Sequence, residues 1–153
     1  MVDKLAREGN DQAFNFTKSK IDGLDFSFSG IKTSFLYFLR DQKAKNEHFI
    51  EENINDLCAS IQRNLVEILM DKVEAAVQQT GITSVAIAGG VSANSQLRNC
   101  LNLMQERQGW RVFIPKFEYC TDNAAMIAMA GYLQYQAGSR TEQGVAPSAR
   151  LPF

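Results

Sequence analysis

Residues 85–98, VAIAGGVSANSQLR, set the architecture of this chain more than any other stretch. An apolar segment runs into two glycines, and a polar segment of helical character follows them. This order is typical of a βα unit, in which a buried strand turns sharply into a helix. The stretch therefore predicts a strand over 84–88 and a helix over about 93–108.

Helices and one more short strand are predicted on either side of this unit. RVFI, residues 111–114, predicts a strand, and a helix is predicted to follow over about 121–137. Upstream, apolar residues recur at three-and-four spacing and predict helices over 31–45 and about 54–79, the second stopping at Gly81. Short strands alternating with helices indicate an α/β protein with a small, mostly parallel sheet flanked by helices.

The sequence of the amino-terminal third predicts a few further elements, which do not form a complete domain by themselves. Residues 1–8 predict the end of a helix, and the alternation in DFSFS, residues 25–29, predicts a third strand that Gly30 ends. Three short strands make a thin sheet, and this order of elements is not a self-contained doubly wound fold. We therefore expect residues 1–153 to form a single partial domain.

Composition narrows the functional classes. The chain has 153 residues and a net charge of −1, so it has no general attraction for phosphate backbones. Its three cysteines, Cys58, Cys100 and Cys120, are widely separated, which predicts buried free thiols in a reducing cytoplasm. We recognise neither a signal peptide nor an apolar run long enough to span a membrane, so no membrane partner is expected.

The double-glycine turn is the strongest candidate site. Gly89 and Gly90 would let the backbone approach a ligand closely, and the helix that follows would present free N–H groups to it. A tight strand-to-helix connection with no ligand is the alternative, because the spacing is neither a P-loop nor a full dinucleotide fingerprint.

The sequence CTDN, residues 120–123, opens the last predicted helix. Thr121 or Asp122 would make a good N-cap. Alternatively, Asp122 would offer a hard oxygen to a metal beside a nucleotide, although one carboxylate cannot hold a metal alone. His48 is the single histidine and is expected to be exposed, so this chain contains no two-histidine metal site.

A third candidate follows the predicted strand at 25–29. Ser27, Ser29 and Gly30, with Lys32 after them, could surround phosphates or an anionic intermediate. The alternative is a turn into a helix with the lysine in solvent.

Together these motifs resemble the tRNA N6-adenosine threonylcarbamoyltransferase family, formerly called O-sialoglycoprotein endopeptidases or glycoproteases. The resemblance is carried in order by VDKLAREGN (2–10), DFSFSGIKT (25–33), VAIAGGVSANSQLR (85–98) and CTDNAAMIAMAGY (120–132). It implies the C-terminal part of an actin-like, ribonuclease-H-like fold of the ASKHA class, with ATP or an adenylate held between two lobes. The N-terminal lobe would be absent.

The family's activity is the transfer of threonylcarbamoyl from threonylcarbamoyl-AMP to N6 of the adenosine next to the anticodon. The resemblance implies that Asn94 binds the nucleotide, with Gly89 and Gly90 as a backbone wall. It also implies that Asp3 contacts the adenosine nucleotide and that Asp122 is a ligand of a divalent metal, iron or zinc. The partners implied are tRNA and a paralogous subunit.

Departures from the family predict a chain that is inactive alone. The family's His-x-x-x-His metal ligands do not occur here, and Ala124 stands where many relatives have glycine. A metallopeptidase, as the older label implies, would require a zinc-type histidine motif. An interaction or oligomerisation domain that self-associates through exposed core is a further alternative. Four basic residues are candidates for contacts with tRNA, but nothing distinguishes them from ordinary solvated surface charges: Arg98, Arg107, Lys116 and Arg140.

Overall fold

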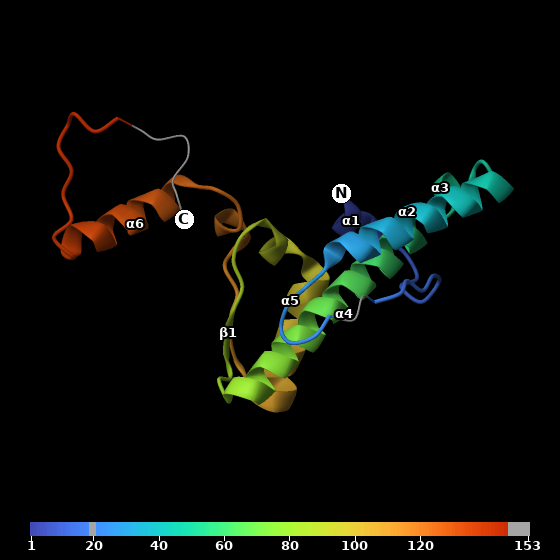
Figure 1. Ribbon diagram of the computed structural model, residues 1–153, viewed down its shortest axis with the longest axis horizontal. Helices are drawn as coiled ribbons and strands as arrows, with labels where there is room; N and C mark the ends of the chain where they lie inside the picture. Colours follow the sequence, from blue (N-terminus) through green and yellow to red (C-terminus); the bar gives the residue numbers. More distant parts are fainter. Residues whose placement is uncertain (19–20, 147–153) are drawn as a thin grey trace.

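A computed structural model describes residues 1–18 and 21–146. The structure is mostly helical and contains a small parallel sheet, which confirms the predicted α/β class (Figure 1). The elements are α1 (Val2–Ala6), α2 (Phe28–Lys45), α3 (Phe49–Glu52), α4 (Ile54–Thr80), β1 (Ser84–Ala86), the 3₁₀ helix η1 (Gly90–Ala93), α5 (Ser95–Gln108), β2 (Arg111–Phe113), the 3₁₀ helix η2 (Phe117–Tyr119) and α6 (Ala124–Gln136).

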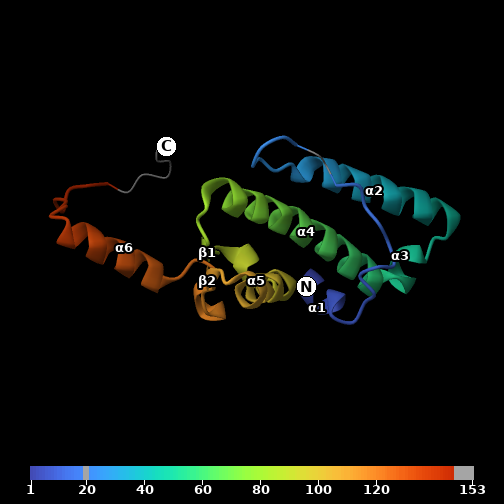
Figure 2. The same ribbon diagram turned by 90° about the horizontal axis from the view of Figure 1, so that it is seen from below.

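Helix α4 is the central support of the fold. Its 27 residues match the predicted range, and Gly81 ends it in the left-handed conformation, with φ of 71°, as the sequence indicated. Helix α2 runs along α4 in both views, α5 crosses close to α4, and α1 packs against α4 near its beginning (Figures 1 and 2).

The sheet has two parallel strands joined through α5. Ser84 pairs with Arg111 and Ala86 with Phe113. The main core lies where α4, α5 and the sheet meet, and its buried members are Val66, Met70, Leu97, Leu101 and Trp110. Each large apolar side chain buried there contributes roughly 1.5–3 kcal/mol.

An aromatic cluster joins the amino-terminal segment to α2 and α3. Phe14 lies 5.4 Å from Phe38 and 5.7 Å from Phe49, measured between ring centroids, and Phe16 lies 5.2 Å from Phe35. Asn64 on α4 donates to the Phe16 carbonyl oxygen at 2.8 Å. Residues 14–16 are therefore held between α4 and the two shorter helices.

The predicted strand at 25–29 is wrong. Helix α2 begins at Phe28, Ser27 occupies its N-cap position, and Gly30 lies within its first turn. A strand needs a partner for its backbone groups, and both strands of the described sheet lie elsewhere in the chain. The rings of Phe26 and Phe28 stack on each other at 5.9 Å instead of lining one face of a sheet.

Helix α6 extends away from the other elements (Figures 1 and 2). It is strongly apolar, yet none of its residues is buried; Ile127 is 76% exposed. Within the described residues, no helix is long and apolar enough to cross a membrane.

Candidate functional site

The two candidate loops lie at the same end of the sheet. The chain leaves β1 toward η1 and leaves β2 toward η2, and both turns gather at one end of the two strands (Figure 1). Because the strands are parallel, this is their carboxyl edge, where α/β proteins most often bind ligands.

Gly89 is required by the backbone of the first loop. Its φ of 76° and ψ of −179° belong to a region that only glycine enters readily. Apart from each glycine's own neighbours along the chain, no heavy atom of the described residues lies within 4 Å of the position that a Cβ would take on Gly89 or Gly90. The loop is therefore exposed and leaves room for a close approach to its backbone.

Asn94 holds the start of α5. Its Oδ1 accepts a hydrogen bond from the Leu97 amide at 2.9 Å, which caps the helix. Its Nδ2 donates to Gln62 Oε1 on α4 at 2.8 Å. These two bonds use one N–H of Nδ2 and one lone pair of Oδ1, so the second of each can still meet a ligand.

Asp3 lies at the same helix start. Its Oδ1 accepts hydrogen bonds from the Ser95 amide at 3.0 Å and the Ser95 hydroxyl at 2.7 Å, and its Oδ2 is 2.9 Å from Arg7 Nη2. Burial alone would raise the pKa of this carboxyl, but the bonds from Ser95 and Arg7 outweigh it and lower the pKa of Asp3. The fold thus brings together Asp3 and Asn94, which are 91 positions apart in the sequence.

Two adjoining cavities connect these residues with the start of α2. One, of about 270 Å³, is lined by Asp3, Asn94, Val91 and side chains of α4. The other, of about 470 Å³, is lined by Ser29, Lys32, Val91 and mainly apolar side chains. Both share Ile61, Leu65 and Val91, so they form one groove over α4.

The groove's composition changes along its length. At the α2 end its walls are largely apolar, with Phe28, Ile31 and Phe35 around Ser29. Ser27 makes no capping bond through its side chain, and Gly30 is helical. A phosphate role for Ser27, Ser29 and Gly30 therefore stays a prediction.

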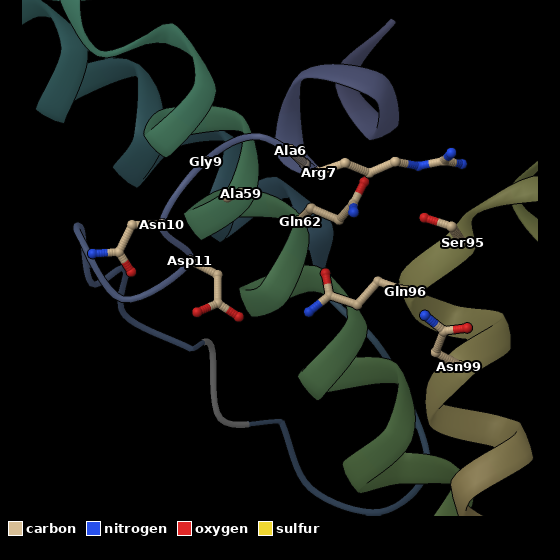
Figure 3. A pocket seen from close by; sticks show the side chains of 10 residues that line it. All are labelled: Ala6, Arg7, Gly9, Asn10, Asp11, Ala59, Gln62, Ser95, Gln96 and Asn99. Atoms are coloured by element: carbon tan, nitrogen blue, oxygen red, sulfur yellow. The ribbon is translucent and has the colours of Figure 1, made fainter.

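A polar hollow that sequence reasoning missed lies beside Asp3. Its volume is about 330 Å³, and Figure 3 shows residues from three segments gathered around it. Its walls are Ala6, Arg7, Gly9, Asn10, Asp11, Ala59, Gln62, Ser95, Gln96 and Asn99. No local motif could have revealed it, because residues 6–11, α4 and α5 meet only in the fold. Gln62 lines both this hollow and the groove.

Asp122 follows η2 and is exposed. The predicted cap at Thr121 or Asp122 is wrong: Asn123 caps α6, since its Oδ1 accepts from the Met126 amide at 3.1 Å. An asparagine directly before the first helical residue satisfies an unpaired N–H better than a residue one position further away. The Asp122 carboxylate is thereby left outside the helix cap.

The residues present do not fit a metal by themselves. Among residues 1–18 and 21–146, no group of three His, Cys, Asp or Glu side chains is arranged to hold a metal ion. His48 is exposed, as predicted, and its Nδ1 lies 3.3 Å from Glu51. Asp122 can therefore serve as one ligand of a site only if further ligands come from other residues.

One expectation about surface charge is wrong. Arg98 is half-buried, and it donates to the backbone oxygens of Ser92 and Pro115. The sequence could not show this, because these carbonyl groups become available only when α5 packs between the two loops.

The fold and the loops define an α/β protein with a glycine-rich turn at the carboxyl edge of a parallel sheet. The family model of tRNA N6-adenosine threonylcarbamoyltransferase matches residues 1–129, and the chain belongs to that family. This membership agrees with the actin-like fold class that the resemblance implied.

Curated relatives of that name match nearly the whole chain. The Riemerella anatipestifer protein is 51% identical over 150 residues, covering 98% of this chain and 44% of its own length. The Christiangramia forsetii protein is 50% identical, covering 100% and 45%. The Salinibacter ruber protein is 44% identical, covering 98% and 46%. The chain therefore spans less than half the length of these relatives.

Proposed function

We propose that this chain is the C-terminal portion of an enzyme that transfers threonylcarbamoyl from threonylcarbamoyl-AMP to N6 of the tRNA adenosine next to the anticodon. The observation that carries the proposal is the match to relatives named for this activity over nearly all of the chain. The shared carboxyl edge of the two candidate loops supports it.

In this proposal the groove over α4 and the adjoining loop form one wall of the nucleotide site. Gly89 and Gly90 bring the backbone close to ATP or threonylcarbamoyl-AMP, and Asn94 supplies an amide to it. Asp3 accepts a hydrogen bond from a ribose hydroxyl through the Oδ2 lone pair that Arg7 leaves available, since Ser95 occupies both acceptor positions of Oδ1.

Asp122 is assigned as one ligand of a divalent metal, iron or zinc. In this proposal the remaining ligands come from the portion of the enzyme outside this chain, which agrees with the lack of a three-ligand group among the described residues. The tRNA and a paralogous subunit are the proposed partners, and the cytoplasm is the proposed location.

The proposed transfer requires that the adenylate and the attacking N6 be held in the right orientation, and it requires no protein nucleophile. The adenosine N6 bonds to the carbonyl carbon of the threonylcarbamoyl group, the bond from that carbon to the phosphate oxygen breaks, AMP leaves, and N6 loses a proton. Holding the adenylate against a rigid backbone wall lowers the entropic part of this barrier.

We propose further that the chain alone is inactive and binds nucleotide weakly. A ligand that binds only the native state raises its thermal midpoint. Adding ATP with a divalent metal should therefore leave the melting temperature of this chain unchanged. A clear rise would contradict the proposed weakness of binding.

A chimera tests the activity itself. The amino-terminal portion of the Riemerella anatipestifer relative, joined to residues 1–153 and mixed with the proposed paralogous subunit, should modify an unmodified tRNA when supplied with threonylcarbamoyl-AMP. The modified nucleoside is detected by mass after digestion. Asp122→Asn in the chimera should abolish transfer, whereas Glu47→Gln, at an exposed position far along the chain, should not. A folded chimera with no activity would overturn the proposal.

The exposed helix favours one second function, self-association of the isolated chain. α6 has 13 residues, none buried, and its exposed large apolar side chains include Met126, Ile127, Tyr132 and Leu133. Exposed apolar surface of this extent is typical of interfaces. Light scattering after size exclusion should show oligomers of the isolated chain and a monomeric chimera, if α6 packs against the amino-terminal portion.

A further inference from the structure

Arg98, on the first turn of α5, touches both candidate loops. Its Nε donates to the Ser92 carbonyl oxygen at 2.6 Å, in the turn after β1. Its Nη2 donates to the Pro115 carbonyl oxygen at 2.7 Å, after β2, and lies 3.1 Å from Cys120 Sγ. Its guanidinium carbon lies 4.0 Å from the centroid of the Phe117 ring.

These contacts use the geometry that is specific to arginine. A guanidinium presents five N–H donors in a rigid planar fork, so it can hold several acceptors in fixed directions at once. Here its partners are uncharged backbone carbonyls, a thiol and an aromatic face. Such an arrangement joins two segments of chain, in contrast to a surface ion pair, which is mobile and weak.

The segment that Arg98 holds has little other anchorage. Cys120 is 1% exposed, and its thiol also lies 3.4 Å from the Lys116 carbonyl oxygen. Beyond it, Thr121 and Asp122 are exposed, and α6 contributes no buried residue. The position of Asp122 relative to the first loop therefore depends mainly on the contacts at residues 115–120.

We propose that Arg98 is a positioning residue of the transferase site, which fixes the segment carrying Asp122 against the loop of Gly89 and Asn94. The catalytic meaning of this role rests on the proposed function above. The mechanical role itself does not, because it concerns only how two loops of this chain are joined.

Cys120 reports on the junction. We would alkylate the native chain at a fixed pH with a thiol reagent and follow Cys120 and Cys58 by peptide mass. Cys58 is buried on α4 and serves as the internal reference for global unfolding. The variants are Arg98→Met, which removes the fork, and Arg98→Lys, which retains the charge and can reach only some of the partners.

We expect Arg98→Met to speed alkylation of Cys120 by about tenfold or more, while Cys58 is unchanged. Tenfold corresponds to about 1.4 kcal/mol, and hydrogen bonds from a charged donor contribute at least that much. Arg98→Lys should give a smaller increase. A third variant, Arg98→Ala, leaves space for a small cation: added methylguanidinium should slow its Cys120 alkylation again, whereas ammonium at equal concentration should not.

Two results would overturn the proposal. Unchanged Cys120 reactivity in Arg98→Met would show that the junction holds without the arginine. Equal acceleration at Cys58 and Cys120 would show a general stabilising role in place of a local one. In the chimera, Arg98→Lys should lower kcat and leave the KM for tRNA unchanged. If the chimera with Arg98 intact is inactive, the proposed function fails. The alkylation result still decides whether Arg98 joins the two loops.

Discussion

Replacing Asn94 separates its structural role from its proposed role in nucleotide binding. Asn94→Ala removes the oxygen that caps α5 and the amide that bonds Gln62. Loss of an N-cap costs about 1 kcal/mol, and loss of one hydrogen bond costs about 1 kcal/mol more. The expected destabilisation is therefore about 2 kcal/mol, which corresponds to a fall of about 4–8 °C in melting temperature for a chain of this size.

Asn94→Asp is the matched variant. Its carboxylate still accepts from the Leu97 amide, and a negative charge is favourable at a helix start. Gln62 can turn its amide to donate to it. Stability by thermal and denaturant unfolding should therefore change by less than about 1 kcal/mol, while transfer by the chimera should be lost with the donor group. An Asn94→Ala chain as stable as the parent would refute the assigned cap. An active Asn94→Asp chimera would refute the nucleotide role.

Three further changes follow from the same contacts. Gly9→Ala should destabilise the chain by about 2 kcal/mol or more in denaturant unfolding, because the new methyl would collide with the backbone of Asn55, whereas Gly131→Ala, with open space around it, should be neutral or stabilising. Asp3→Asn should lower the free energy of unfolding at neutral pH. Because the pKa of Asp3 is lowered in the folded chain, the stability difference between parent and variant should persist above the ordinary pKa of 3.8 and shrink as the pH falls below it. A stability difference that does not depend on pH would contradict this. Ile127→Glu on α6 should shift the isolated chain toward monomer in light scattering, and an unchanged oligomer would exclude this helix as the contact.

Local signals predicted the regular elements well. Helix α4 combines eight apolar residues at helical spacing with a glycine stop, so its predicted range differs from the observed one by a single residue. The strands predicted over 84–88 and 111–114 are observed, somewhat shorter, at 84–86 and 111–113, because short apolar runs between helices are typical of buried parallel strands.

The errors arose where partners distant in sequence decide the outcome. DFSFS alternates like a strand, but no strand pairs with it in the described sheet, and Ser27 instead stands at the start of α2. Arg98 looked like a solvated charge because its acceptors at Pro115 and Cys120 are brought to it only by the fold. The polar hollow beside Asp3 has the same origin.

A crystal structure of the chimera with a non-reactive analogue of threonylcarbamoyl-AMP would test the shared site most directly. We expect the nucleotide against the backbone of Gly89 and Gly90, with the Asn94 amide in hydrogen-bond contact, and the Asp122 carboxylate about 2.0–2.2 Å from a bound metal. An analogue seated elsewhere, with Asp122 turned to solvent on the far side of the sheet, would contradict the assignment of both loops to one site.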